Sequence, residues 1–213
     1  MRRLTLRQFC GPRSCLAVLI LAGCVLPALP QSQADFAALK AKAEAGDSRA
    51  QVQLGVCYAS AEGVPLNYSE SARWFHKAAE QGDVSGEYLL GEMYALGRGV
   101  RQDYKQAAQW IQKAADQGDR RALSNLGAMY LNGLGVKKNE KRAFELTQQA
   151  ADKGLAAAQF GLGSMYANGR GVKQDLSKAM DWYTKAADQG DTPAMNNLAW
   201  LHEYPRYEYQ EHP

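Results

Sequence analysis

The seven residues "KAADQGD" occupy Lys113–Asp119 and return unchanged 72 residues later at Lys185–Asp191. Two related phrases lie at half that spacing: "KAAEQGD" at Lys77–Asp83 and "QAADKGL" at Gln149–Leu155. The chain therefore repeats itself every 36 residues. A fixed period of this size is typical of solenoids, in which each unit packs against its neighbours and no unit folds alone.

Whole columns of identical residues recur at this period. Glycine makes up only 20 of the 213 residues, so five glycines at one phase are not accidental. The columns are Gly46, Gly82, Gly118, Gly154 and Gly190; Leu54, Leu90, Leu126, Leu162 and Leu198; Tyr58, Tyr94, Tyr130 and Tyr166; and Gly63, Gly99, Gly135 and Gly171. The phase never slips, which indicates one continuous array.

Each repeat is predicted to contain two helices. In the first half of one repeat, Ala122, Leu126 and Tyr130 recur at helical spacing, and the segment ends at a turn containing Gly133 and Gly135. The second half begins at a residue that favours the N-cap position, and in two repeats the spacing also fits a capping box. These N-cap candidates are Asn67, Asp103, Asn139 and Asp175, with capping-box partners Glu70 and Gln106 in the first two.

The opening phrase encodes the corner between two repeats. Its alanine pair lets two helices approach closely, its glycine forms the turn after one helix, and its aspartate caps the next helix. The corner recurs because it is built repeatedly, and neither its aspartate nor its glutamine needs a chemical role.

The pattern "A…LG.MY..G.GV..D..KA..W..KAA.QG" resembles the Sel-1-like repeat family, relatives of the tetratricopeptide repeat. It is complete in residues 84–119 and 156–191. In residues 48–83, Ala61 replaces the loop glycine, which predicts a strained or reshaped turn; in residues 120–155, Leu146 replaces the tryptophan. The resemblance implies an all-α, right-handed α-solenoid of about ten helices. The array covers residues 35–204, with half repeats at 35–47 and 192–204 and a tail at 205–213.

Residues 1–34 are predicted to be a secretory signal. Four arginines precede an apolar run at Cys15–Leu29, which is too short to span a membrane comfortably. One interpretation places cleavage after Ser32–Ala34. Another takes "LAGC" at Leu21–Cys24 as a lipobox, with a leader of residues 1–23 and a lipid on Cys24; a retained anchor helix is a weaker third interpretation. All three predict export, to the periplasm or outside the cell, with membrane attachment only through a possible anchor at Cys24.

Charge and cysteine content exclude two other classes. Without the four leader arginines, 21 basic residues face 22 acidic ones, so there is no electrostatic footprint for nucleic acid. Three of the four cysteines lie in the leader, and there is no disulfide framework. The fourth, Cys57, occupies a column otherwise filled by Met93, Met129, Met165 and Leu201, and is therefore predicted to be an apolar core residue.

No motif points to an enzyme, a cofactor or a metal. The sequence contains no HExxH, GxSxG or P-loop, and the three histidines His76, His202 and His212 are scattered. The family resemblance raises one enzymatic alternative, because some cysteine-rich relatives are described as penicillin-binding or weakly β-lactam-hydrolysing. This chain lacks their cysteine pairs, and none of its serines has a lysine three residues later.

Partner binding is predicted on the concave face, which the first helix of each repeat lines in tetratricopeptide repeats. Columns that vary between repeats are available for recognition. Two such columns read Val52, Tyr88, Ser124, Phe160, Asn196 and Val56, Glu92, Ala128, Ser164, Trp200. From them we predict partner-binding residues Tyr88, Glu92, Phe160, Ser164 and Trp200, although some of the aromatics could instead pack between repeats. Glu92 is expected to be solvated rather than catalytic.

The predicted function is an exported adaptor or scaffold in the bacterial envelope, which holds a protein or peptide without making or breaking bonds. The alternative is a module that binds glycan, such as peptidoglycan. Exposed aromatics beside amides are typical of such sites, and Tyr88, Phe160, Asn125 and Asn197 fit that description.

Overall fold

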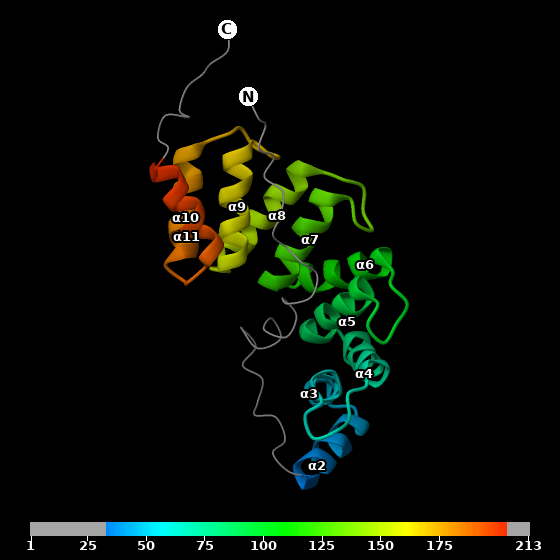
Figure 1. Ribbon diagram of the computed structural model, residues 1–213. Coiled ribbons are helices and arrows are strands. Elements are labelled where there is room, and N and C mark those ends of the chain that lie inside the picture. Colours follow the sequence, from blue (N-terminus) through cyan, green and yellow to red (C-terminus); the bar gives the residue numbers. More distant parts are fainter. Residues whose placement is uncertain (1–32, 204–213) are drawn as a thin grey trace.

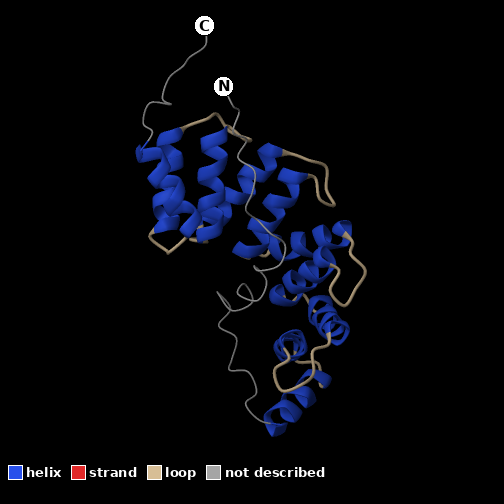
Figure 2. Cartoon of the chain, viewed as in Figure 1, coloured by secondary structure: helices blue, strands red, loops and turns tan. Residues whose placement is uncertain are grey.

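The computed structural model describes residues 33–203, and this part of the chain is an α-solenoid of ten helices without a strand (Figures 1 and 2). The leader up to residue 32, including Cys24, and the predicted tail at 205–213 lie outside the described residues. The helices are α2 Gln33–Glu44, α3 Ser48–Ser60, α4 Tyr68–Glu80, α5 Val84–Leu96, α6 Tyr104–Asp116, α7 Arg120–Asn132, α8 Glu140–Asp152, α9 Ala156–Asn168, α10 Leu176–Ala187 and α11 Thr192–Glu203.

The helices follow one another in a curved row (Figure 1). Each packs against the helix before and the helix after it in the chain, and α3 also touches α5. In Figure 1, α3 and α5 lie toward the inside of the curve, while α4 and α6 lie toward the outside. The odd-numbered helices, which open each repeat, therefore carry the variable columns along one side of the solenoid.

Side-chain caps start most helices where the sequence predicts them. The Asp47 carboxylate accepts the backbone N–H of Ala50 at 2.9 Å, and the Asn67 amide oxygen accepts that of Glu70 at 3.1 Å. The equivalent residues cap α5, α6, α7, α8 and α10. Helix α9 is the exception among these, because its N-cap is Leu155, which has no side chain that can accept a hydrogen bond.

The N-cap backbone groups do not need the capping boxes suggested by sequence spacing. The N–H of Asn67 donates to the carbonyl of Tyr58, and that of Asp103 to the carbonyl of Tyr94, both at 2.9 Å. In each repeat, the backbone carbonyl of the column tyrosine thus accepts the N–H of the N-cap residue. Glu70 does not complete a capping box and pairs instead with Arg73 at 2.9 Å.

The turn after each first helix has one shape. Gly97 ends α5 with φ 65° and ψ 33°, in the left-handed region, and Gly133 and Gly169 match it. Ala61 takes φ 60° and ψ 32° at the same position. The turn at Ala61 is not reshaped, because its backbone angles match those of the glycines. It is strained, because in this conformation the alanine Cβ lies close to the following carbonyl.

The buried apolar residues of the described part form three clusters along the solenoid, and residues of the leucine column lie in each of them. The leucines Leu54, Leu90, Leu126 and Leu162 are buried, and so are the first alanines of the corner phrases. Leu146 is buried in the tryptophan column. Cys57 is a buried free cysteine, as predicted, and burial raises the pKa of its thiol to about 11. Across residues 33–203, no helix combines the length and apolar character needed to cross a membrane.

The glutamine of the corner phrase has a structural role that sequence reasoning missed. Its side-chain amide donates to a buried residue of the preceding first helix: Gln81 to Gln51 at 2.8 Å, Gln117 to Glu87 at 2.8 Å, and Gln189 to Gln159 at 2.7 Å. In the third repeat this pair is Leu123 and Lys153, so the bond is absent there by sequence. These bonds tie the end of one helix pair to the helix that opened it.

Candidate functional site

The two variable columns change from buried to exposed along the solenoid. Val52 and Val56 on α3 are buried, whereas Asn196 and Trp200 on α11 are exposed. The predicted partner-binding residues occupy three separate helices: Tyr88 and Glu92 on α5, Phe160 and Ser164 on α9, and Trp200 on α11. The structure thus brings them together only in pairs within a helix.

Tyr88 and Glu92 form a hydrogen-bonded group on α5. The Tyr88 hydroxyl donates to Glu92 Oε1 at 2.6 Å, and Asn125 Nδ2 on α7 reaches the same two residues at 3.3 and 3.5 Å. Arg121 covers the Tyr88 ring, with its guanidinium carbon 4.5 Å from the ring centre, and pairs with Asp119 at 3.0 Å. Tyr88 is only 8% exposed, so most of its surface is already used by the protein.

The environment of Glu92 differs from the solvated position predicted for it. The side chain is half-buried, and loss of solvent raises the pKa of its carboxyl, although the Tyr88 hydroxyl and the Arg121 charge act in the opposite direction. Burial and the neighbouring Glu92 also raise the pKa of Tyr88. Glu92 is therefore a positioned hydrogen-bond acceptor. Its spacing of four residues from Tyr88 on α5 was visible in the sequence, whereas Asn125 and Arg121 belong to the neighbouring repeat, so their contacts could not be predicted from helical spacing.

Phe160 and Ser164 meet Tyr183 of α10. The rings of Phe160 and Tyr183 lie 5.7 Å apart between centres, and Ser164 Oγ is 3.1 Å from the Tyr183 hydroxyl. Both residues are partly exposed on α9. Trp200, which is 51% exposed, is the most accessible aromatic of the predicted set.

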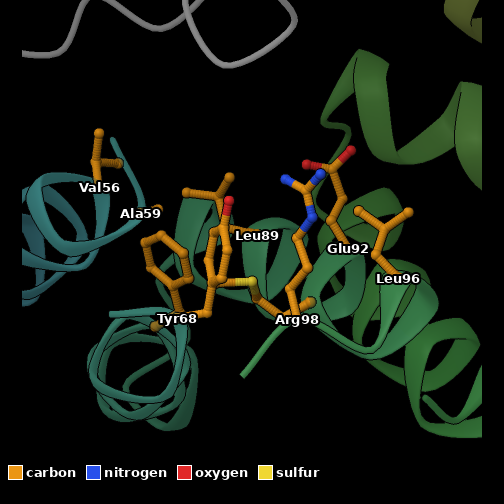
Figure 3. A pocket seen from close by; sticks show the side chains of 9 residues that line it. Val56, Ala59, Tyr68, Leu89, Glu92, Leu96 and Arg98 are labelled. Atoms are coloured by element: carbon orange, nitrogen blue, oxygen red, sulfur yellow. The ribbon is translucent and has the colours of Figure 1, made fainter. Parts of the chain in front are cut away.

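A pocket opens between α3 and α5 (Figure 3). Its walls are Val56 and Ala59 of α3, Tyr68 and Phe75 of α4, Leu89, Glu92, Met93 and Leu96 of α5, and Arg98 of the following turn. Figure 3 shows the Glu92 carboxylate and the Arg98 guanidinium on the same side of the pocket. Its volume is about 30 Å³.

Of the pocket residues, sequence reasoning selected only Glu92 for binding. Leu89, Leu96 and Arg98 were missed, although comparison between repeats contains the signal: Leu89 corresponds to Asn125 and Asn197, and Leu96 to Asn132 and Asn168. In the described part of the chain, no three His, Cys, Asp or Glu side chains are placed to hold a metal ion.

The two amides of the glycan alternative lie on different helices, Asn125 on α7 and Asn197 on α11. Asn125 uses its Nδ2 group on Tyr88 and Glu92, and Asn197 on α11 is partly exposed. Tyr88 and Asn125 thus use hydrogen-bonding groups on contacts within the protein. Fewer of these groups are available to bind a sugar.

Comparison with known proteins gives a consistent result. The Sel1 repeat model matches residues 48–83, 84–119, 120–155, 156–191 and 192–208. A protective antigen of uropathogenic Escherichia coli with an SLR fold is 39% identical, with a TM-score of 0.77 over 80% of this chain and 36% of that one. The present chain therefore spans about a third of that antigen.

Two further solved structures are similar. A Sel1 repeat protein of Oxalobacter formigenes is 33% identical, with a TM-score of 0.77 over 85% of this chain and 72% of that one. An immunity protein of Pseudomonas aeruginosa is 25% identical, with a TM-score of 0.54 over 78% of this chain and 63% of that one. No curated protein matches the chain at a significant level.

Proposed function

The chain belongs to the Sel1 repeat family, whose members are generally protein–protein interaction modules, and from this premise we propose that it is an exported adaptor that holds a protein or peptide along its inner face. Family members are typically non-enzymatic scaffolds. The proposed mechanism is binding on a preformed surface, which loses less conformational entropy on association than a flexible one.

The observation that supports this proposal is a difference in burial between a column that recurs in every repeat and the columns that vary. The leucines Leu54, Leu90, Leu126 and Leu162 of one recurring column are buried in the core. The variable columns supply side chains that are at least partly exposed on the first helices α5, α9 and α11, namely Glu92, Phe160, Ser164 and Trp200. These residues combine apolar surface with hydrogen-bonding groups, as protein interfaces do. An adaptor needs no more than this.

The proposed location is the bacterial envelope, in the periplasm or secreted, with a possible lipid anchor at Cys24. The support is the sequence of residues 1–34, in which an arginine-rich segment precedes a short apolar run and small residues. The inner face would then meet proteins outside the cytoplasm. The proposed partners do not include nucleic acid.

The test is affinity capture from envelope extract with the tagged chain, read by mass spectrometry. The test variant combines Glu92→Ala, Phe160→Ser and Trp200→Ser, residues that the same columns already hold at Ala128, Ser124 and Ser164. Tyr88 is left unchanged because it is buried. A control variant replaces Lys105 and Gln109, exposed on α6, by alanine.

If the adaptor proposal is correct, the wild type and the control variant capture one specific protein. The test variant does not capture it. Circular dichroism checks that all three proteins keep the same helical content. Capture that is equal in all three would remove the inner face from the proposal. Recovery of cell-wall fragments without a protein would favour the glycan alternative.

A further inference from the structure

The two long edges of the solenoid carry opposite charge, although basic and acidic residues nearly balance outside the leader. The turn edge consists of the loops between the two helices of a repeat with their flanking residues, at 96–105, 132–141 and 168–177. It holds eight basic and three acidic residues. The corner edge consists of the corners between repeats, at 44–49, 80–85, 116–121, 152–157 and 188–193. It holds nine acidic and four basic residues.

The turns follow one another along the molecule. Each first helix ends at its turn and each second helix begins there, so every turn lies at the same end of its helix pair. Figure 2 shows the loops after α5, α7 and α9 in tan, one after another along the right and upper margin of the row. The positive charges of successive turns therefore belong to one surface.

Most cations of the turn edge have no carboxylate partner. The exceptions include Lys138 and Arg170, which share the carboxylate of Glu140 at 3.0 and 3.5 Å. The hydrogen bond from Lys138, together with these two charges, lowers the pKa of Glu140 below its ordinary value of 4.5. The exposed cations that form no ion pair within residues 33–203 are Arg101, Lys105, Lys137, Lys141 and Lys173. The turn edge thus presents positive charge that the described part of the chain does not neutralise.

Exposed apolar side chains gather at the same edge. Within residues 33–203, six large apolar side chains are exposed, and two of them, Met195 and Trp200, lie on the last helix, α11. A third, Leu66, lies in the turn between α3 and α4. The other three lie in the turn edge, at Leu96, Tyr104 and Leu134. The turn edge therefore combines positive charge with apolar side chains that the fold leaves in water.

We propose that the turn edge docks the protein on an anionic lipid surface. Its lysines and arginines lie against the headgroup phosphates, while Leu96, Tyr104 and Leu134 enter the boundary between headgroups and acyl chains. A tyrosine suits this boundary because its ring is apolar and its hydroxyl is polar. The docked protein keeps its inner face free for a partner, so the inference goes beyond the proposed adaptor function.

The composition of the turn edge favours lipid over other anionic surfaces. Protein interfaces are depleted in lysine, yet four of the five unpaired cations are lysines. The phosphates of a nucleic acid would match the cations but leave the exposed leucines in water. An anionic lipid surface matches both, because its headgroups attract basic residues and its acyl chains accept apolar ones.

The experiment measures binding of the full chain to lipid vesicles by co-sedimentation. One set of vesicles contains equal parts of phosphatidylglycerol and phosphatidylcholine, and the other contains phosphatidylcholine alone. The leader is identical in the wild type and in all variants, so its own affinity for lipid is common to every measurement. Differences between variants therefore report on the solenoid.

The charge variant neutralises one exposed cation in each turn. It combines Arg101→Gln, Lys137→Gln and Lys173→Gln, which occupy the same position in three successive repeats. The matched control removes three exposed cations at or near the corners and has the same net charge. It combines Lys42→Gln, Arg49→Gln and Lys153→Gln.

The apolar variant combines Leu96→Asn with Leu134→Asn. Other repeats hold Asn132 at the position of Leu96, and Arg98 at the position of Leu134, so the fold does not require a leucine at either. This variant keeps every charge of the turn edge. It therefore separates the contribution of apolar contact from that of charge.

We expect the wild type and the control to bind anionic vesicles about tenfold more tightly than neutral ones, and to bind them more weakly as salt concentration rises. The charge variant should bind anionic vesicles about a hundredfold more weakly than the wild type, from the loss of three basic residues. The apolar variant should bind them about tenfold more weakly. Circular dichroism checks that all the proteins keep the same helical content.

Hydrogen–deuterium exchange of the full chain then localises the contact. Anionic vesicles should slow amide exchange in the turn edge but not in the corner edge, and this protection should be lost in the charge variant. Protection elsewhere, equal binding of the charge variant and its control, or equal binding to both kinds of vesicle would overturn the inference. Capture of an acidic protein through the turn edge, without binding to vesicles, would also overturn it. The adaptor proposal is judged separately, by capture that depends on Phe160 and Trp200.

Discussion

Ser71 departs from its column in a fully buried position. The other repeats place Ala107, Ala143 and Ala179 there, and all four residues lie in the core. The Ser71 hydroxyl has no hydrogen-bond partner among the described residues, so it has lost water without compensation.

Replacing this serine by alanine should therefore stabilise the protein. We expect Ser71→Ala to raise the free energy of unfolding by about 1 kcal/mol, because it removes an unsatisfied buried hydroxyl and restores the residue of the other repeats. Urea denaturation followed by circular dichroism measures the change. Ser69→Ala, on the exposed side of α4, is the control for helix propensity, and an equal gain from both variants would contradict the burial argument.

Ala61 holds a conformation for which the other repeats use glycine. With φ 60° it occupies the left-handed region, where a side chain costs about 1–2 kcal/mol, while glycine costs about 0.5–1 kcal/mol more entropy on folding. The strain is the larger effect, so Ala61→Gly should raise the thermal midpoint slightly. Gly97→Ala, the reverse change one repeat later, should lower it; the same sign for both variants would show that strain does not decide this turn.

At the scale of the element, the corner phrase links three helices. Gln117, at the end of α6, donates to Glu87 of α5, and Asp119 then caps α7. Glu87 is only 4% exposed, and burial raises the pKa of its carboxyl, with Gln117 and Lys113 acting in the opposite direction. Two other repeats place the neutral Gln51 and Gln159 at this position.

This comparison predicts a pH-dependent contribution to stability. Because the folded state raises the pKa of Glu87 above its ordinary value of 4.5, its favourable contribution is complete below that pH and is lost as pH rises through the folded pKa. Glu87→Gln should therefore stabilise the protein at neutral pH and change little near pH 4. Urea midpoints between about pH 4 and about pH 8 test this, and Glu44→Gln, at an exposed glutamate, is the control substitution.

Sequence predicted the elements of this fold more completely than its site. Periodicity places the helices, their caps and the buried columns, because these depend on residues near one another in the chain. The bond of Gln117 to Glu87 joins the two helices of one repeat, and the contact of Glu92 with Asn125 joins neighbouring repeats; both depend on how helices distant in the chain pack together. To predict the pocket at Leu96, one would have to know both that Leu96 differs from its equivalents in other repeats and that α3 lies near α5.

At the scale of the whole molecule, the proposed export by residues 1–34 would decide which partners the inner face can meet. We predict that the chain expressed with residues 1–34 is recovered from the envelope or the medium, and that deletion of these residues keeps it in the cytoplasm. Fractionation with immunodetection measures both. Mass spectrometry of the mature N-terminus then separates a lipid on Cys24 from cleavage before Asp35, while cytoplasmic recovery of the full chain would contradict export.

The uniform corner also affects how such a gene can change. The identical phrases at Lys113–Asp119 and Lys185–Asp191 are sites where misaligned recombination would remove two whole units and leave the reading frame intact. Loss of residues 120–155 alone would join Asp119 to α9 and give that helix the capping aspartate that Leu155 denies it. The number of repeats can thus change by whole units in a single step. Each shortened chain still has a complete corner where the remaining repeats meet.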